Sequence, residues 1–394
     1  MTVLFILFLL ALFLLFYTYL GYPLLAVILS RVAAHPVQKA PHTPPLTVII
    51  PAFNEAAVIA RKIENTLAMD YPPEQMQIIV VDDGSDDGTP DIVRGYADRG
   101  IELISDAVRR GKVAAMNRAV KLARGEIIVF TDADVTGEPD ALRCMIENFA
   151  DERVGCVTSG HRILREGSSV GESNDLYWRY ESIIKVAESR IHSSLAASGH
   201  MLAVRRDLVE PLPEDMVIDD FYRALTVIRQ GYRVIYEPRA IMWQRPVVSM
   251  EDEVKRRKRM TGGRYQVLTM LGQFLPHFPA GLSFMLISHK FLRPLIPFYM
   301  MAALVLNVAL VAIPVPWWGR ETPAVWIGLL ALLAGQVVFY LAALGGWLQS
   351  RARRRSRLLA VPYYLVSTNM GGLQGLFWFL SGRRTVLWEQ VKRE

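Results

Sequence analysis

The chain has 394 residues, with 44 Lys and Arg against 38 Asp and Glu, a formal net charge of +6, and 52% hydrophobic residues. A positive mean hydropathy of +0.23 beside 21% charged residues indicates apolar blocks joined to an ordinary polar region, which excludes a simple cytosolic enzyme. An aromatic content of 10% excludes a disordered or collagen-like chain. The two cysteines, Cys144 and Cys156, lack C-x-x-C spacing, which argues against a disulfide framework and against a thiolate zinc site.

The first predicted element is a transmembrane helix over residues 1–30. Residues 3–30 carry no charge, and about 20 apolar residues are enough to cross a bilayer as a helix. The block lacks the basic start of a signal peptide and is too long for one, so a membrane anchor is favoured. Basic residues follow from Arg31 onward. The positive-inside rule then predicts an integral inner-membrane protein with its N-terminus outside and its following domain in the cytoplasm.

Residues 31–264 are expected to form a cytosolic α/β domain. Runs rich in β-branched residues at 46–53 (LTVIIPAF), 76–83 (MQIIVVDD) and 126–134 (EIIVFTDAD) alternate with helical stretches such as 55–69. This alternation predicts a Rossmann-like, doubly wound parallel sheet with helices on both faces. A G-x-G-x-x-G or G-K-[ST] loop does not follow the first run, which argues against a dinucleotide oxidoreductase and against a P-loop enzyme.

Polar residues follow each of these three predicted strands. They are Asn54 and Glu55 after the first, Asp82 and Asp83 at the end of the second, and Asp132 and Asp134 at the end of the third. Because ligands of such sheets bind beyond the carboxyl ends of the strands, these side chains are expected to share one crevice. Gathered carboxylates repel one another unless a cation neutralises them. The D-x-D of Asp132 and Asp134 therefore predicts a Mg²⁺ or Mn²⁺ site whose remaining positions are filled by a diphosphate.

Apolar character returns in the last third of the chain. Residues 265–293 are predicted to form amphipathic helices on the inner leaflet, and residues 294–313 and 324–348 are predicted transmembrane helices. Residues 358–380 are long enough to span, but basic residues flank both ends. A transmembrane and a re-entrant or interfacial segment both stay open, with the latter favoured. Residues 381–394 form a predicted basic cytosolic tail.

Taken together, the motifs of the middle region resemble the family 2 inverting glycosyltransferases of the GT-A fold. In chain order they read VIIPAFNEA, IIVVDDGSDDGT, GKVAAMNRA, VFTDADV and IDDFYRAL, and the match extends over residues 46–262. With YWRYE at 177–181, RRKRMTGGRYQ at 256–266 and the membrane segments, the chain resembles the membrane-integrated processive branch. That branch contains the cellulose, chitin, hyaluronan and poly-N-acetylglucosamine synthases.

The resemblance implies a role for each matching residue. The nucleotide-sugar donor is expected to contact Ala52, Asn54, Glu55, Asp82, Asp83, Lys112, Asn117, Asp132, Arg256 and Arg259. The divalent metal is expected on Asp132 and Asp134, with Asp134 as the more direct ligand. The loop of Ser198, Gly199 and His200 is the candidate acceptor site, against the alternative that a histidine in a glycine turn is structural.

Asp219 and Asp220 match the catalytic acidic pair of the family. The resemblance implies that Asp220 is the general base, with Asp219 beside it, in a single displacement that inverts the anomeric centre. A carboxylate suits this position because a hydroxyl is a poor nucleophile, and positioned proton removal gives about 10²–10⁴-fold. The alternative is that the pair caps the helix that follows.

The family's Gln-x-x-Arg-Trp motif is present only in part, as Arg256-x-x-Arg259-Met260. Arg259 keeps a phosphate-binding side chain, whereas the tryptophan that stacks near the acceptor sugar is replaced. The basic run there could instead be a membrane-surface patch. Tyr177, Trp178 and Tyr180 have helical spacing and are expected to pack as core.

The predicted function is an inverting hexosyltransferase that uses a UDP-sugar, either a hexose or an N-acetylhexosamine, to extend a polysaccharide at the inner membrane. It is expected to help export the product, with an export partner or a second copy of the chain, and to contact membrane lipid. The alternative is a single sugar addition to a lipid acceptor, either polyprenyl phosphate or a glycolipid. A non-catalytic membrane scaffold is less favoured, because all the matching carboxylates are present. Nucleic-acid binding is not expected, because the basic residues are not interleaved with aromatics on one face.

Overall fold

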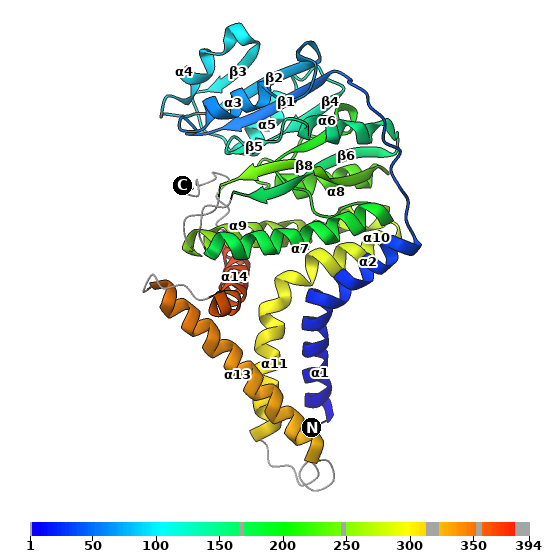
Figure 1. The fold of residues 1–394 in the computed structure, drawn as a ribbon, viewed down its shortest axis with the longest axis vertical. Coiled ribbons are helices and arrows are strands. Elements are labelled where there is room, and N and C mark those ends of the chain that lie inside the picture. The colour runs from blue at the N-terminus through cyan, green and yellow to red at the C-terminus, as the bar shows by residue number, and fades with distance from the viewer. Residues whose placement is uncertain (1, 165–168, 246–249, 313–322, 352–356, 383–394) are drawn as a thin grey trace.

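A computed structural model describes residues 2–164, 169–245, 250–312, 323–351 and 357–382. A mixed α/β domain lies above a group of long apolar helices, and the two parts meet at a layer of helices that lie beneath the sheet (Figure 1). Most of the predicted basic tail, residues 383–394, lies outside the described residues.

Four parallel strands make up the first half of the sheet, in the order β3-β2-β1-β4. They are β1 (Leu46–Ala52), β2 (Met76–Asp83), β3 (Ile101–Asp106) and β4 (Ile127–Phe130). The β-branched residues of β1 are buried along its whole length, as expected for a strand covered on both faces. The predicted strands at 46–53, 76–83 and 126–134 are therefore confirmed, and their carboxyl ends share one edge of the sheet.

The second half of the sheet, for which no strands were predicted, is mixed. The remaining strands are β5 (Val135–Gly137), β6 (Val154–Ile163), β7 (Leu202–Arg205) and β8 (Arg233–Gln244). β7 runs antiparallel to both β4 and β6, β8 runs parallel to β6, and β5 pairs antiparallel with β8. The whole sheet has eight strands in the order β3-β2-β1-β4-β7-β6-β8-β5 within the described ranges. The observed architecture is a Rossmann-like GT-A core.

Short helices cover the two faces of this sheet and bury one apolar core on each side. They are α3 (Ile59–Leu67), α4 (Thr89–Arg94), α5 (Lys112–Val120), α6 (Ala141–Ile146) and α8 (Asp219–Arg229). The helix expected at 55–69 begins only at Ile59, because residue Asn54 has a positive φ of 55° and the chain turns once more before the helix starts. Both faces are thus closed, which leaves the strand ends as the polar edge.

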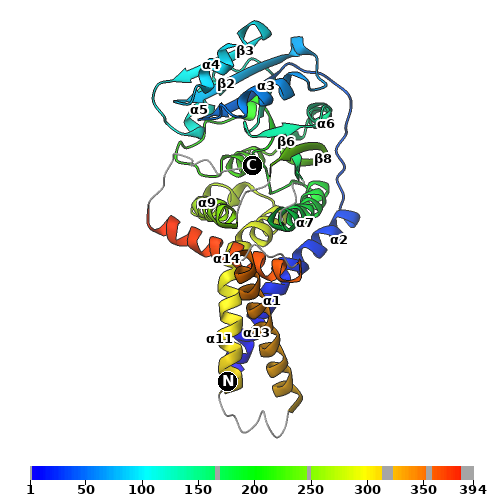
Figure 2. The same cartoon turned by 60° about the vertical axis from the view of Figure 1, so that its left-hand side comes forward.

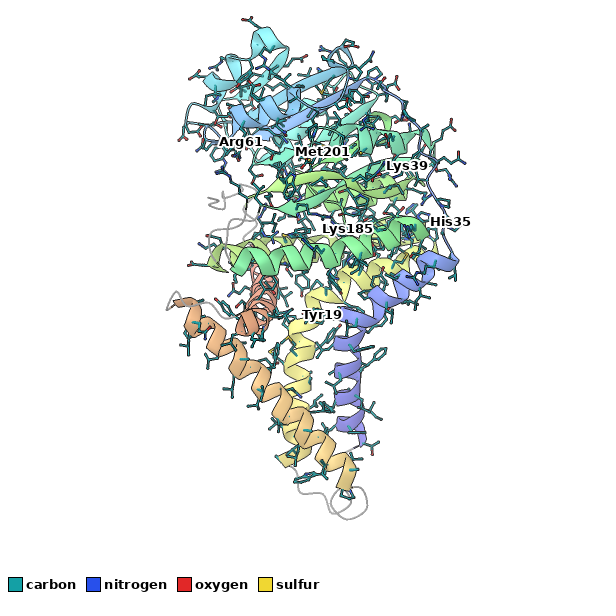
Figure 3. The ribbon with its side chains drawn as sticks, viewed as in Figure 1. Tyr19, His35, Lys39, Arg61, Lys185 and Met201 are labelled. Carbon is teal, nitrogen blue, oxygen red and sulfur yellow. The ribbon has the colours of Figure 1, made fainter. Side chains whose placement is uncertain are left out.

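A layer of helices separates the sheet from the membrane helices. Its longest members are α7 (Ser169–Ile191) and α9 (Met250–Leu268), which both lie beneath the sheet at the same level (Figures 1 and 2). The labelled Lys185 marks α7 at this level (Figure 3). The segment that follows α9 contains the 3₁₀ turns η6 (Leu271–Gln273) and η7 (Leu275–His277), then α10 (Ala280–Leu286).

Three helices are long and apolar enough to cross a membrane among the described residues: Thr2–Val32, Ala280–Ala312 and Pro323–Ser350. The first bends at the π-helical segment η1 (Tyr17–Gly21) between α1 (Thr2–Phe16) and α2 (Tyr22–Val32), and α2 packs against α7. The helix predicted for residues 1–30 is therefore present with a bend at η1. α2 belongs partly to the core of the α/β domain, because Tyr22 and Ala26 are buried in it.

The second candidate span is longer than predicted. It joins α10 to α11 (Ile296–Ala312) through the irregular turns η8 (Ile287–Phe291) and η9 (Arg293–Leu295). Residues 280–293, predicted to lie on the inner leaflet, are continuous with α11, and Leu282, Met285 and Phe291 are buried in the apolar core of the α/β domain; their place at the membrane stays a prediction. Residues 296–312 themselves lie within the predicted 294–313, and α13 (Pro323–Arg351) covers the predicted 324–348.

The ambiguous segment 358–380 forms one continuous helix, α14 (Arg357–Leu380), with Pro362 inside it. α14 lies crosswise to α1, α11 and α13 and packs along α9 (Figure 2), and it is not among the three candidate spans. The two helices pack closely because each has a glycine at the contact. A Cβ on Gly262 of α9 would lie 2.3 Å from a ring carbon of Trp378, and a Cβ on Gly375 of α14 would lie 2.7 Å from the Lys258 carbonyl oxygen. The interfacial placement of residues 358–380 stays a prediction.

Candidate active site

The loops after β1 and β2 are tied to each other by reciprocal hydrogen bonds. Asn54 Nδ2 donates to Asp86 Oδ1 at 2.8 Å, and the Asp86 backbone N–H donates back to Asn54 Oδ1 at 3.0 Å. The backbone N–H of Asn54 donates to Ser85 Oγ, and that of Glu55 donates to Thr89 Oγ1. The Asn54 side chain therefore joins the loop after β1 to the loop after β2. Ala52 is the last residue of β1 and is buried.

Asp82 and Asp83, at the end of β2, are each only 1% exposed. Asp83 accepts hydrogen bonds from the backbone N–H groups of Arg110, at 2.9 Å, and Gly111, at 2.7 Å. Asp82 accepts from the Ser105 hydroxyl at 2.9 Å. Both carboxylates thus fix loops at the strand ends, and Asp83 fixes the loop from which Lys112 projects. Their contact with a nucleotide base stays a prediction.

Lys112 joins the D-x-D turn to the acidic pair. It is the first residue of α5, and its Nζ lies 2.8 Å from Asp132 Oδ1 and 3.5 Å from Asp219 Oδ1. Burial would lower the pKa of Lys112, but the carboxylates of Asp132 and Asp219 hold it above its usual value. Asp134 lies on the same turn, partly exposed. The structure therefore brings together the predicted metal-binding turn, the predicted basic residue and the predicted catalytic pair.

The acidic pair opens helix α8. The residue that precedes the helix is Ile218, whose side chain makes no capping hydrogen bond, so Asp219 and Asp220 are first-turn residues and not the N-cap. Their negative charges still complement the positive end of the helix dipole. The structural alternative is therefore a charge–dipole interaction with α8 and not an N-cap hydrogen bond. Burial and the neighbouring charge of Asp219 raise the pKa of Asp220 to about 6, which fits a group that gains and releases a proton near neutral pH.

The Ser198–His200 loop lies directly behind the D-x-D turn. The Thr131 hydroxyl donates to the His200 carbonyl at 2.6 Å, and a Cβ on Gly199 would lie 3.2 Å from Asp132 Oδ2. The His200 ring bonds Ser198 Oγ through Nδ1, and burial lowers its pKa to about 4. His200 is therefore a neutral, enclosed side chain. Acceptor contact by this loop stays a prediction.

An aromatic cluster continues from His200 toward α7. The His161 ring stacks on His200 with 3.9 Å between centroids, and Trp178 meets the His161 ring edge-on at 4.5 Å. The Arg256 guanidinium lies 6.0 Å from the Trp178 ring centroid. Trp178 was expected as core packing, but it lies in this polar cluster next to the site and supplies an aromatic ring near the place where the family's tryptophan is missing.

Three residues that were predicted to contact the donor are placed otherwise in the described structure. Asn117 uses its amide on the backbone of Leu212, donating to the carbonyl at 2.8 Å and accepting from the N–H at 3.1 Å. Arg259 is exposed on α9, and none of the described side chains pairs with it. Arg256 pairs with Glu253, with Nε 2.9 Å from Oε2.

Sequence reasoning missed two buried cations of the site. Lys62 of α3 is 0% exposed, and its Nζ donates to Thr131 Oγ1 at 2.7 Å and to the Val135 carbonyl at 3.1 Å, on both sides of the D-x-D. Arg223 of α8 is 1% exposed, with its guanidinium 4.1 Å from the Phe130 ring centroid, and it lines a small cavity with Lys112 and the acidic pair. The helical spacing of Lys62 from Ile59, Ile63 and Thr66 could have indicated its burial, because all four lie on the buried face of α3.

Replacing Lys62 with methionine should flatten the dependence of stability on pH. Burial lowers the Lys62 pKa to about 7, from 10.5, so the unfolded chain binds more protons than the folded chain between these values, and the wild type gains stability as the pH rises from 7 toward 10. Melting temperatures at pH 7 and 9.5 measure this gain. The exposed Lys121→Met variant should gain as much stability between pH 7 and 9.5 as the wild type. If Lys62→Met also gained as much, the lowered pKa of Lys62 would be contradicted.

Residues 47–212 match the model of Glycosyl transferase family 2. The poly-beta-1,6-N-acetyl-D-glucosamine synthase of Staphylococcus aureus (strain COL) is 28% identical over 229 residues, which cover 57% of this chain and 55% of that protein. The enzyme of the same name from Staphylococcus epidermidis is 27% identical over 231 residues, with the same coverage. The chain thus spans about half the length of the curated relatives it matches.

A solved structure resembles nearly the whole chain. The mannosyltransferase PcManGT from Pyrobaculum calidifontis, in complex with GDP-Man and Mn²⁺, superposes with a TM-score of 0.68 at 26% sequence identity. The match covers 93% of this chain and 99% of that one. The similarity therefore includes the helices outside the α/β domain.

Proposed function

We propose that this chain, whose residues 47–212 match the model of Glycosyl transferase family 2, transfers a sugar with inversion from a UDP-sugar to an acceptor hydroxyl at the membrane. The observation that carries the proposal is the ammonium of Lys112, which lies 2.8 Å from Asp132 and 3.5 Å from Asp219. One cation thus links the turn that would hold the donor's diphosphate to the acidic pair that would activate the acceptor.

The donor is proposed to be a UDP-hexose or UDP-N-acetylhexosamine. The motifs around Asp83 and Lys112 support a uridine diphosphate, and the names of the staphylococcal relatives support N-acetyl-D-glucosamine as the sugar. PcManGT was solved with GDP-Man, so GDP-mannose is the competing donor. The two bases differ in their hydrogen-bonding edges, so direct comparison of the two nucleotides separates them.

The D-x-D turn fits a divalent metal. Asp132 and Asp134 supply two hard carboxylate ligands at the polar edge of the sheet, and no cluster of three or more candidate ligands exists among the described residues. A Mg²⁺ or Mn²⁺ ion held there would therefore need the diphosphate oxygens to complete its shell. When bound, the ion would stabilise the charge of the leaving diphosphate. The Mn²⁺ in the PcManGT complex supports this assignment.

The remaining chemistry is assigned to side chains of the chain itself. Asp220 would take the proton of the acceptor hydroxyl as its oxygen bonds to the anomeric carbon, while the bond from that carbon to the diphosphate oxygen breaks. Lys112 would pair with the departing diphosphate once donor binding draws it from Asp132. One displacement of this kind inverts the anomeric centre.

The enzyme is proposed to work at the inner face of the inner membrane, with its N-terminus outside. Three apolar helices of spanning length support membrane integration, and the staphylococcal relatives support extension of a polysaccharide, with export aided by a partner or a second copy. Transfer of one sugar to a lipid acceptor is the second candidate. A cavity between the α/β domain and the membrane helices favours it.

The deciding experiment is a turnover assay in lipid nanodiscs with radiolabelled UDP-glucose, UDP-N-acetylglucosamine and GDP-mannose, with and without Mn²⁺ or Mg²⁺. A metal-dependent, high-mass product from a UDP-sugar is the expected result. A short lipid-extractable product would support the second candidate. Turnover of GDP-mannose alone would refute the proposed donor, and no turnover with any donor would refute the function.

A further inference from the structure

A cavity of about 430 Å³ lies between the α/β domain and the membrane helices. Its walls come from η1, α7, α9, η9, α11 and α14. Tyr19, one of its lining residues, lies where α1 and α11 reach the domain (Figure 3). A volume of this size is within the range of small-molecule sites, and Leu20 and Val361 at its edge are 60% and 47% exposed on the membrane side of the chain.

The walls of the cavity have two chemical characters. The membrane helices supply apolar residues such as Leu20, Ile296 and Leu365, whereas three guanidinium groups enter from α9 and η9: Arg257, Arg264 and Arg293. A ligand that suits both parts has an apolar chain and an anionic head.

The charges of the cavity are not balanced by the described side chains. Arg257 pairs with Glu253 at 2.8 Å, but that carboxylate is already shared with Arg256. Arg293 pairs with Glu181. Arg264 has no carboxylate within 4 Å among the described residues, although it is only partly exposed. A guanidinium in such a place is costly unless an anion joins it.

The hydroxyl of Tyr177 is exposed to the positive charge of these three guanidinium groups. Burial alone would raise the pKa of its hydroxyl, yet the guanidinium groups of Arg257, Arg293 and Arg264 hold that pKa well below its usual value. A phosphate monoester or diester is the anion that best matches several guanidinium forks. A neutral glycan would bring no anion to these three guanidinium groups.

The cavity is next to the catalytic pair. α9 packs directly on the segment before α8, since a Cβ on Gly263 would lie 2.8 Å from the Ile218 side chain, and Ile218 precedes Asp219 in the chain. Arg264, the next residue of α9, interacts electrostatically with Asp220. A head group on Arg264 would therefore present its far end to the proposed base.

We propose that this cavity binds the phosphate head of a membrane lipid that carries the acceptor, with Arg264 as the main phosphate contact and the lipid chain leaving between α14 and the spans. The inference rests on the proposed function and names its acceptor class. The lipid is either a polyprenyl-type phosphate or a phosphate-linked glycolipid, because both present a phosphate ester at the same depth. In the first case a phosphate oxygen would itself attack the anomeric carbon and would need no base. In the second a sugar hydroxyl would attack and lose its proton to Asp220.

The test compares Arg264→Met and Arg264→Lys with Lys255→Met, which removes a cation of α9 whose side chain is 62% exposed and outside the cavity. Nanodiscs of phosphatidylcholine receive polyprenyl phosphate, the neutral polyprenol, or phosphatidylglycerol. Lipid retention is measured by native mass spectrometry without donor, and the KM for the lipid is measured with donor.

Polyprenyl phosphate should be retained over polyprenol by the wild type and by Lys255→Met. Arg264→Met should raise the KM for the lipid by roughly tenfold or more, because charge-assisted bonds contribute about 1.5–3 kcal/mol, with nucleotide affinity unchanged and partial recovery in Arg264→Lys. Equal behaviour of Arg264→Met and Lys255→Met would overturn the proposal, and equal retention of phosphatidylglycerol would reduce the cavity to a bulk-lipid site. Because retention needs no donor, these outcomes are separate from a failure of the proposed transfer.

Discussion

Asp220→Asn is expected to lower kcat by about 10²–10⁴-fold, because the amide cannot accept the proton of the acceptor hydroxyl. Nucleotide affinity should change little, since Asp220 is on α8 and the donor loops follow β1, β2 and β4. The pKa of Asp220 is raised to about 6 by burial and by Asp219. The wild-type rate should therefore fall as the pH drops through 6 and the base becomes protonated. Initial rates between pH 5 and 8, with nucleotide titrations, measure both effects.

Stability distinguishes loss of the base from misfolding in this variant. Asp220 binds a proton more tightly in the folded chain than its ordinary value of 3.8, so the stability that this group contributes is lost as the pH rises through 6. At pH 8, Asp220→Asn should consequently melt no lower than the wild type. The exposed Glu214→Gln variant of the preceding loop should retain activity. A fully active Asp220→Asn enzyme would refute the assignment.

Removal of divalent metal with EDTA is expected to reduce transfer to background, and added Mn²⁺ or Mg²⁺ should restore it. Asp132→Asn should weaken activation by the metal by about 100-fold, because it removes one of the two carboxylates of the D-x-D. The same substitution takes the 2.8 Å partner from Lys112. The activating metal concentration, measured with donor at saturation, is the relevant quantity.

The matched control for this experiment is Asp98→Asn, which changes an exposed carboxylate in the 3₁₀ turn η3 (Ala97–Arg99). It should titrate with metal like the wild type. Full activity in EDTA, or an unchanged metal titration in Asp132→Asn, would show that the diphosphate is neutralised by side chains such as Lys112 and Arg256 instead.

The parallel half of the sheet could be predicted because each of its strands is a local pattern. β1 and β2 are continuous β-branched runs that end in polar residues, and the position of those polar residues predicts the candidate site. The other half could not be predicted. β6 and β8 pair in parallel although Val154 and its partner Arg233 are far apart in the chain, and no local periodicity encodes such a pairing.

The candidate site divides in the same way. Lys112, Asp132 and Asp219 belong to motifs, and the structure brings them together. Arg223 belongs to a helix that is buried almost all round, so its sequence context gives no face to which a cation could be assigned. Asn117 was assigned to the donor loop by its motif, but its amide holds Leu212, which only the tertiary contact reveals.

The close glycine contacts between α9 and α14 have a mechanical consequence. With Trp378 against Gly262 and Gly375 against the Lys258 carbonyl, neither helix can slide or tilt without carrying the other. A mismatch between the bilayer thickness and a transmembrane helix costs fractions of a kcal/mol per Å. The candidate span α13 packs against α14, so such a force would pass through α14 to α9. We therefore expect the turnover rate to depend on the thickness of the surrounding bilayer as well as on the donor concentration.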